Sequence, residues 1–243
     1  MIDFTSAIRQ NLETVRERIL LAAQGAGRDP DGVRLVVVTK AQPVEVVAAA
    51  VEAGAKLLGE NYAEEGARKI DALGKEGGLE WHMIGHIQSR KARLVSQYFD
   101  MVHSLDSLPL ARRIDQAAGE LHRKIPVLLE FNLGGEETKS GWAVENEEDW
   151  PALIPEIAQI SSLGAIRIAG LMAMPPLALE PGGSREYFVK LRKLREFLAL
   201  SLPEIQWDEL SMGTSADYEV AVQEGATLVR VGRAILGPRP ARD

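Results

Sequence analysis

The chain has 243 residues, of which 46% are hydrophobic and 26% are charged, a balance typical of a globular protein. Its net charge of −7 argues against non-specific binding to nucleic acid, and the absence of cysteine excludes disulfides, thiolate catalysis and cysteine-ligated metal. The N-terminus lacks the basic and apolar regions of a signal peptide, and no apolar run approaches the roughly 20 residues of a membrane span, so we expect a cytoplasmic protein.

The chain begins with a predicted helix and then alternates strands with helices. Over residues 5–24, apolar residues recur at steps of three and four, which predicts a helix. Strands are predicted at 35–38, 56–59, 81–85, 100–103, 125–131, 166–174, 209–211 and 227–231. Helices between them are predicted near 43–53, 63–73, 90–93, 107–122, 148–160, 188–198 and 215–224.

This alternation predicts the fold class. Eight evenly spaced strand–helix units in about 240 residues favour a single α/β domain, a (β/α)₈ barrel of the TIM type with an extra N-terminal helix. We assign residues 1–30 to the helix and lead-in, 31–235 to the barrel and 236–243 to a tail. An open sheet is the alternative, but no GxGxxG follows the first strand, which weakens a dinucleotide-binding interpretation.

A lysine stands at the end of the first predicted strand. Residues 35–38 read Leu-Val-Val-Val, and apolar faces on both sides are typical of a buried parallel strand. Lys40 follows two residues later, with Pro43 just beyond. A lysine in this place extends into solvent, pairs with an acid or loses its proton, and a neutral amine forms Schiff bases with carbonyl compounds. This segment alone favours an ordinary solvent-facing lysine.

The loop after the seventh predicted strand has residue types that hold phosphate. In barrels, phosphate often binds in the loops after the last two strands. The segment 211–215 reads Ser-Met-Gly-Thr-Ser, so Ser211 offers a hydroxyl and Gly213 allows close backbone approach. Thr214 and Asp217 have the spacing of a capping box, which predicts that a helix starts here. The free N–H groups of such a start favour an anion.

The last strand adds two arginines and a glycine. Gly232 and Arg233 follow it and complete a predicted phosphate site. A Schiff-base lysine beside a phosphate site indicates a phosphorylated aldehyde, either pyridoxal 5′-phosphate (PLP) or the phosphosugar of an aldolase-type enzyme. Arg230 lies between two valines that pack on one face of the strand, so it points to the other face; if that face is the inward one, Arg230 could bind the pyridine nitrogen of PLP. A salt bridge to a carboxylate such as Glu60 is the equal alternative.

Seven motifs in the right order resemble the pyridoxal phosphate homeostasis proteins of the YggS/PROSC type. They are Val38-Thr39-Lys40-x-x-Pro43, Gly59-Glu60-Asn61-Tyr62, residues 81–88, Lys139-Ser140-Gly141, Gly170-Leu171-Met172, Leu210-Ser211-Met212-Gly213 and Val229-Arg230-Val231-Gly232. The resemblance covers nearly the whole chain. It implies a fold-type III PLP barrel, similar to the N-terminal domain of alanine racemase.

The resemblance also implies the cofactor site. PLP is expected on Lys40 as a Schiff base, and the residues expected around it are Asn61, Ser211, Gly213, Arg230, Gly232 and Arg233. Two positions depart from the family pattern. Arg233 stands where a small hydroxyl residue is common, so a side-chain hydroxyl is lost while the backbone N–H remains. Thr214 stands where methionine is common. Neither departure removes the expected PLP site.

The chemistry favours a carrier. An arginine cannot accept the proton of the ring nitrogen, so PLP beside Arg230 is a weak electron sink. The chain ends shortly after the last strand, so we expect no added domain with a second racemase base. We therefore predict a PLP-binding homeostasis or delivery protein with no assigned catalytic residue. A PLP-dependent amino-acid racemase of low activity is the second alternative, and a Schiff-base aldolase is the third.

Partners and the remaining residues are less determined. We expect a monomer that binds PLP, with apo PLP-enzymes as candidate recipients and with no nucleic-acid or membrane partner. The four histidines have no metal-site spacing, so no metal ligand is assigned. Lys139 is either a solvent-facing loop residue, a second aldehyde-reactive amine or a gate.

Overall fold

The computed structural model describes residues 4–136, 139–176 and 183–239. The strands are β1 (Arg34–Val38), β2 (Leu57–Glu60), β3 (Glu80–Met83), β4 (Met101–Leu105), β5 (Ile125–Asn132), β6 (Trp142–Ala143), β7 (Ile166–Ala173), β8 (Glu209–Ser211) and β9 (Leu228–Val231). The α-helices are α1 (Phe4–Gly25), α2 (Val44–Glu52), α3 (Ala63–Leu73), α4 (Ala92–Tyr98), α5 (Leu108–Glu120), α6 (Ile154–Ser161), α7 (Arg185–Ser201), α8 (Tyr218–Gln223) and α9 (Arg233–Leu236). Short 3₁₀ turns cover Pro30–Gly32, Glu76–Gly78, Ser89–Lys91 and Glu147–Leu153.

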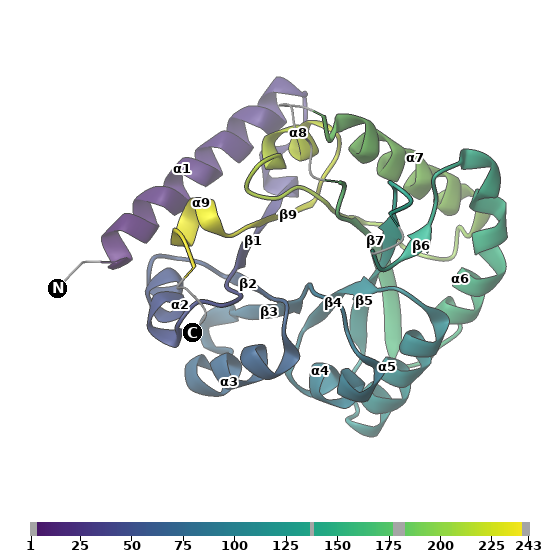
Figure 1. The fold of residues 1–243 in the computed structure, drawn as a ribbon, viewed down its shortest axis with the longest axis horizontal. Helices are drawn as coiled ribbons and strands as arrows, with labels where there is room; N and C mark the ends of the chain where they lie inside the picture. Colours follow the sequence, from purple (N-terminus) through teal and green to yellow (C-terminus); the bar gives the residue numbers. More distant parts are fainter. Residues whose placement is uncertain (1–3, 137–138, 177–182, 240–243) are drawn as a thin grey trace.

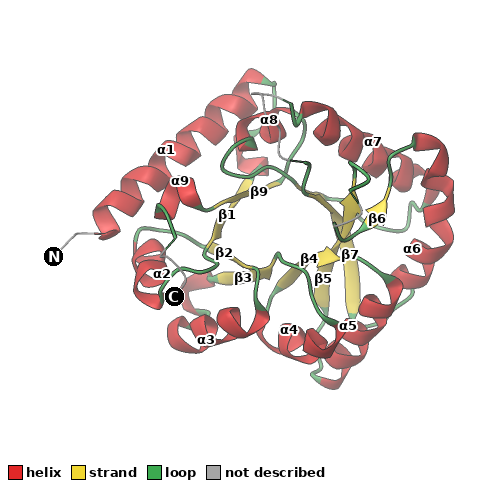
Figure 2. Cartoon of the chain, viewed as in Figure 1, coloured by secondary structure: helices red, strands yellow, loops and turns green. Residues whose placement is uncertain are grey.

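Eight parallel strands close into a barrel, and the helices surround it (Figures 1 and 2). Pairing runs through β1, β2, β3, β4, β5, β7, β8 and β9, and β9 pairs with β1 to close the ring. β6 adds to the end of β5. The expected (β/α)₈ barrel is therefore confirmed, and the open-sheet alternative is wrong because the first and last strands are hydrogen-bonded to each other.

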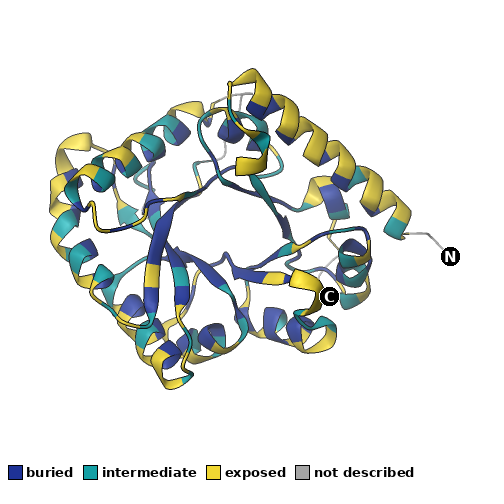
Figure 3. Ribbon diagram, turned by 180° about the vertical axis from the view of Figure 1, so that it is seen from behind, coloured by how far each residue is buried: buried dark blue, intermediate teal, exposed yellow. Residues whose placement is uncertain are grey.

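The alternation of side chains along each strand separates two apolar clusters. The large outer cluster lies between the strands and the helices, and in Figure 3 the buried strands are ringed by helices with exposed outer faces. The small inner cluster consists of strand residues that fill the barrel, namely Val36, Met101, Leu128, Ala169, Met172 and Leu228. In β9, Val229 and Val231 belong to the outer cluster, so Arg230 between them points into the barrel.

The N-terminal helix completes the outer layer on one side. The apolar stripe of α1, which includes Ile8 and Leu12, is buried against α2, α8 and α9. The side chain of Asn11 donates to the backbone oxygen of Ile235 (3.0 Å), which ties α1 to α9. In the part of the chain that the structure describes, no helix combines the length and apolar character needed to cross a membrane.

Several element boundaries differ from the prediction for local reasons. β6 and α9 are too short to show a hydrophobic period. The predicted helix from 148 begins as a 3₁₀ turn, because Pro151 lacks the N–H that a regular α-helix requires. The helix predicted from 215 starts only at Tyr218, since the Oδ1 of Asp217 accepts the N–H of Thr214 (2.7 Å) and holds a turn there. Gly182 and residues 240–243 lie outside the described residues.

The late start of α8 corrects the predicted anion site at this helix. The helix spans six residues, Tyr218–Gln223, so its dipole is shorter than that of the predicted helix from 215 to 224. Any attraction for an anion at this loop must therefore come from side chains and from the N–H groups of the loop.

A substitution at Gly170 can test how closely the backbones of β7 and β8 approach each other. Its φ is +153°, and a Cβ on this residue would lie 1.9 Å from the backbone oxygen of Glu209. Gly170→Ala should therefore push the strands apart and lower the free energy of unfolding by about 3 kcal/mol in urea denaturation. Gly164→Ala is the control, because nothing lies within 4 Å of its added Cβ. A Gly170→Ala variant as stable as the Gly164→Ala control would contradict this account.

Candidate functional site

A cavity of about 160 Å³ opens where the strands end. Five of the residues predicted for the site line it: Lys40, Asn61, Arg230, Gly232 and Arg233. They come from the carboxyl ends of β1, β2 and β9, which closure of the barrel brings together. In a parallel barrel, this end of the strands is where functional groups gather.

Two predicted residues, Ser211 and Gly213, are not among those that line the cavity. Ser211 is fully buried beneath Arg230 and accepts a hydrogen bond from its Nη1 (2.5 Å). Gly213 has φ +90°, and a Cβ there would lie 2.5 Å from that of Ala221, so it allows the loop to approach α8 closely. A direct contact of these two residues with a cofactor stays a prediction.

Ser215 lies in the cavity instead, although it was not assigned to the site. It lines the wall beside Thr214, and its hydroxyl oxygen accepts the backbone N–H of Gly232 (3.2 Å). This bond joins the loop after β8 to the loop after β9. The signal was present in the sequence, because Ser215 belongs to the same predicted phosphate segment as Ser211.

The charge of the cavity has one sign. Its charged lining residues are Lys40, Arg230, Arg233 and Arg239, and none of the described lining residues is Asp or Glu. This contrasts with the net charge of −7 for the whole chain. A partly enclosed wall with several cations and no acid attracts an anionic ligand.

Lys40 is half-buried at the edge of this cavity. Burial is the main cause that lowers the pKa of its amine, and Arg239 and, less strongly, Arg230 act in the same direction, while Tyr62 and Glu60 act in the opposite direction. The amine is therefore neutral at a lower pH than an ordinary lysine. A neutral amine is the form that attacks a carbonyl carbon.

The backbone around Lys40 is held in an uncommon conformation. Ala41 has φ +57°, in the left-handed region that residues with a Cβ rarely adopt. Its N–H donates to Glu65 Oε1 (2.6 Å), and Lys69 donates to the backbone oxygen of Thr39 (2.7 Å). Two side chains of α3 thus fix the backbone on both sides of Lys40.

A buried ion pair supports this turn. Lys69 Nζ lies 2.7 Å from Glu60 Oε1 and 2.6 Å from Glu65 Oε1, and Thr39 Oγ1 donates to the same oxygen of Glu60 (2.6 Å). Glu60 and Lys69 are almost completely buried, and burial raises the pKa of Glu60 while Lys69 lowers it. The predicted alternative of a Glu60–Arg230 salt bridge is wrong, because Glu60 pairs with Lys69.

Sequence reasoning missed Lys69 and Glu65. Their spacing of four residues within the correctly predicted helix α3 is the spacing of a helical ion pair. Such pairs are common on exposed helix faces, so the pattern alone does not show that this one turns inward and reaches Thr39.

Arg230 is held from below and faces the cavity. Its Nη2 donates to the backbone oxygen of Ala173 (2.9 Å), in addition to the bond from Nη1 to Ser211. Burial lowers the pKa of Arg230 to about 10, and Glu130 and Asp217 act in the opposite direction. The guanidinium therefore stays charged at neutral pH and can only donate hydrogen bonds.

Glu130 is a second residue that sequence reasoning missed. Burial and, less strongly, the charge of Asp106 raise its pKa to about 7, against the opposite effect of Arg230. Its Oε2 is buried and has no hydrogen-bond partner among the described residues. No motif marks it, because Glu130 stands in an otherwise apolar strand.

Lys139 lies beside the mouth of the barrel. It forms an ion pair with Glu136, and its Nζ donates to the backbone oxygen of Met174 (3.3 Å), a residue of the cavity wall. These contacts do not test whether Lys139 acts as a gate or as a second reactive amine, so both roles stay predictions. Residues 137 and 138 of the same loop lie outside the described residues.

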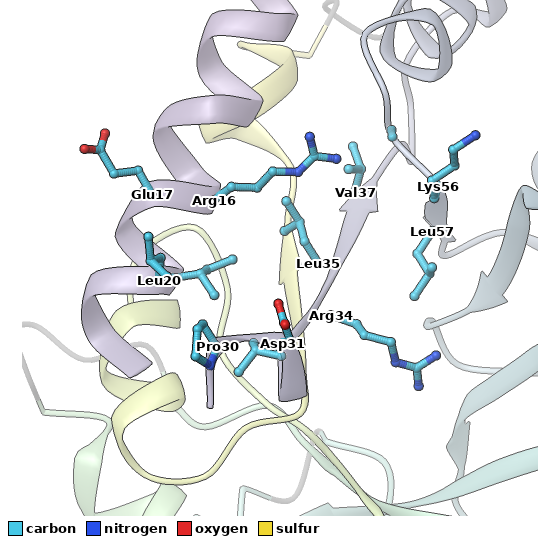
Figure 4. A pocket seen from close by; sticks show the side chains of 13 residues that line it. Arg16, Glu17, Leu20, Pro30, Asp31, Arg34, Leu35, Val37, Lys56 and Leu57 are labelled. Carbon is cyan, nitrogen blue, oxygen red and sulfur yellow. The ribbon is translucent and has the colours of Figure 1, made fainter. Parts of the chain in front are cut away.

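A larger cavity of about 510 Å³ lies between α1 and the strands β1 and β2 (Figure 4). The cationic side chains that line this larger cavity are bound to other parts of the protein. Arg16 and Lys56 donate to backbone oxygens, and Arg34 forms an ion pair with Glu209 (2.5 Å). The smaller cavity contains Lys40 and Arg230, both with a lowered pKa, together with three more of the residues predicted for the site. The smaller cavity is therefore the candidate functional site.

Comparisons with known proteins define the class. The family model described as alanine racemase, N-terminal domain, matches residues 5–240. An alanine racemase of Clostridium difficile shares the fold, with a TM-score of 0.70 at 20% identity over 97% of this chain and 58% of that chain. The chain is thus a barrel of the alanine racemase N-terminal type.

More similar relatives identify the family within this class. Pyridoxal phosphate homeostasis proteins of Vibrio alginolyticus and Pseudomonas aeruginosa are 39% and 41% identical, each over 96% of this chain and over 98% and 96% of their own lengths. The structure of PipY from Synechococcus elongatus with PLP bound has a TM-score of 0.81 at 34% identity, covering 95% of this chain and all of that chain. The chain belongs to the family of pyridoxal phosphate homeostasis proteins.

Lys69 provides a test of the buried ion pair. Lys69→Met removes the cation and leaves the carboxylate of Glu60 buried, which should lower the free energy of unfolding by about 3 kcal/mol at neutral pH. The double variant with Glu60→Gln removes the stranded charge as well and should recover most of the loss. Urea denaturation measures both, and equal stability of Lys69→Met and wild type would refute the structural role.

Glu130 provides a test by pH. Its folded pKa of about 7 lies above the ordinary 4.5, so its contribution to stability is full below pH 4.5 and is lost as the pH rises through 7. Glu130→Gln should therefore be more stable than wild type above pH 7, by roughly 2–3 kcal/mol. The difference should shrink toward pH 4.5.

The control for this test is Glu148→Gln, which changes an exposed carboxylate and should follow wild type at each pH. Chemical denaturation at several pH values gives the comparison. A constant difference between Glu130→Gln and wild type at all pH values would show that Glu130 does not titrate in this range.

Proposed function

We propose that this protein binds pyridoxal 5′-phosphate at the mouth of its barrel and takes part in PLP homeostasis, holding the cofactor covalently on Lys40. The observation that carries the proposal is a lysine of lowered pKa in a cavity whose charged lining residues are all cations. An aldehyde that carries a phosphate matches both features. The names of the relatives and the PLP-bound structure of PipY support the same cofactor.

The residues present fit this cofactor. Lys40 offers the amine, and Arg233 and Arg239 offer charge for the phosphate near the backbone N–H of Gly232. The amide oxygen of Asn61 is buried in the cavity wall without a partner among the described residues, so a ligand donor can satisfy it. Arg230 offers donors for the ring nitrogen.

When bound, PLP supplies a reactive aldehyde and a pyridine ring that can act as an electron sink. The amine of Lys40 adds to the aldehyde carbon and water leaves, so a C=N bond replaces the C=O bond. Arg230 cannot take up a proton, and it donates a hydrogen bond where an electron sink requires an acid. These residues bind and orient the cofactor while leaving its ring poorly suited to sustained catalysis, which supports a carrier.

The finer parts of the proposal concern partners. A carrier role implies that apo PLP-enzymes are the recipients and that the protein works in the cytoplasm, where we propose that it acts as a monomer. The barrel with its N-terminal helix forms the functional unit in this proposal.

The attachment to Lys40 is tested by absorption. After incubation with PLP, the wild-type protein should show a visible Schiff-base band, and borohydride should fix the cofactor to a peptide that contains Lys40. Lys40→Ala should lose the band completely because the nucleophile is gone. Lys56→Ala, which removes a lysine of the other cavity, is the matched control and should keep it.

A band that survives in Lys40→Ala would assign the aldehyde to another amine, and peptide mapping would then decide whether it is Lys139. The carrier role is tested separately, by transfer of bound PLP to an apo-enzyme and by racemisation assays with alanine and other amino acids. Sustained racemisation would favour the enzyme alternative over the carrier.

A further inference from the structure

A chain of hydrogen bonds crosses the barrel interior beneath Arg230. Its Nη1 donates to Ser211 Oγ (2.5 Å), which lies 2.9 Å from His103 Nδ1. The Nε2 of His103 lies 2.9 Å from His82 Nδ1, and His82 Nε2 is 3.4 Å from Glu80 Oε2. The members belong to β9, β8, β4 and β3, so the chain connects opposite walls of the barrel.

The chain lies in an apolar environment. Ser211 and His103 are fully buried and His82 is 1% exposed, next to the inner cluster that fills the barrel. Polar groups in such a place are costly unless each has a partner. Both ring nitrogens of each histidine and the hydroxyl of Ser211 have a hydrogen-bond partner, so each of these buried polar groups is satisfied.

The charges at the two ends fix the direction of the bonds. Arg230 can only donate, so the oxygen of Ser211 accepts and its own proton goes to His103 Nδ1. His103 then carries its proton on Nε2 and donates to His82 Nδ1. His82 also carries its proton on Nε2 and donates to the carboxylate of Glu80. The opposite direction would leave the Ser211 proton without an acceptor and would turn a lone pair of His82 toward a carboxylate.

We propose that His103 and His82 are positioning residues that hold the proton of Ser211 away from Arg230. The guanidinium then keeps an acceptor beneath it and directs its remaining N–H groups into the cavity, toward the ring nitrogen of the cofactor. Only this last step, from Arg230 to PLP, rests on the proposed function. The direction of the chain is a property of the protein itself.

The electrostatics keep His103 neutral. Burial lowers the pKa of His103 well below its ordinary value, and His82, Arg230 and Arg34 lower it further. His103 therefore adds no second cation beneath Arg230. Two acids act on Arg230. They are Glu130 of β5 and Asp217 of the turn before α8, and neither belongs to this chain of hydrogen bonds.

The first experiment needs no cofactor. The sequence has four histidines, so ¹⁵N NMR of histidine-labelled protein gives a simple spectrum. Variants His86→Gln and His122→Asn, which change the two exposed histidines, identify the remaining signals. From the hydrogen-bond geometry we expect both buried imidazoles to carry their proton on Nε2 at neutral pH. A neutral Nδ1–H tautomer or a protonated ring at either position would overturn the proposed direction.

The second experiment measures the effect on the cofactor. His103→Phe removes both hydrogen-bonding nitrogens, whereas His103→Gln keeps one acceptor and one donor. We expect His103→Phe to weaken PLP binding about tenfold and to shift the visible absorption band, with His103→Gln closer to wild type on both measures. His122→Asn is the matched control, since it removes an exposed histidine at a left-handed position that asparagine tolerates.

The outcomes separate the two proposals. If His103→Phe and His103→Gln bind PLP like wild type with an unchanged band, the positioning role is refuted. Equal losses of affinity in both variants with an unchanged band would also refute it, because they indicate a purely structural role. If the wild-type protein forms no Schiff base at all, the proposed function fails, and the tautomers measured by NMR still decide the direction of the chain.

Discussion

The hydrogen bonds between β1 and β9 are the constraint on which the site depends. They pair Val36 with Arg230 and Val37 with Val231, so residues of the first and last strands in the sequence become neighbours. Lys40 then reaches the same cavity as Gly232, whose absent Cβ would lie 3.1 Å from the backbone oxygen of Val38. Without this pairing of the first strand with the last, the amine and the arginines would not be neighbours in one cavity.

Two buried polar networks surround this junction and have different chemistry. On one side, Lys69 and Glu60 form a charged pair that supports the backbone next to Lys40. On the other side, the neutral chain from Ser211 to His82 lies under Arg230. The charged network holds the backbone at the nucleophile, and the neutral network holds a cation without adding charge beside it. Both networks therefore hold residues of the cavity in place, and neither adds an Asp or Glu to the described residues that line it.

Much of the fold could be predicted from the sequence because the spacing of its apolar residues clearly distinguishes strands from helices. The apolar run before Lys40 and the alternation of strands and helices lead to the barrel, and the position of Arg230 between two valines placed its side chain on the face opposite to theirs. The sites of Lys40, Asn61 and Gly232 followed from motifs at strand ends. Short elements such as β6 and α9 carry too few residues for a pattern to be visible.

The rest of the site depends on tertiary contacts that the sequence does not encode locally. Ser211 and Ser215 are both serines of the predicted phosphate segment, yet only Ser215 lines the cavity, because Ser211 belongs to strand β8 and points into the barrel. Lys69 was missed as the partner of Glu60 because the sequence does not show which way α3 faces. The pKa of Glu130 depends on burial against groups from other strands, so its spacing in the sequence gives no signal.

The cations of the cavity have a consequence for how strongly the molecule holds together. Lys40, Arg230, Arg233 and Arg239 carry like charges, and Arg239 and Arg230 add to the effect of burial in lowering the pKa of Lys40. An anion in the cavity relieves it, and a ligand that binds only the folded chain stabilises that chain by mass action. Inorganic phosphate in a buffer is such an anion. If inorganic phosphate binds in this cavity, the melting temperature of the protein depends on the buffer, and its intrinsic stability is best compared in buffers without polyvalent anions.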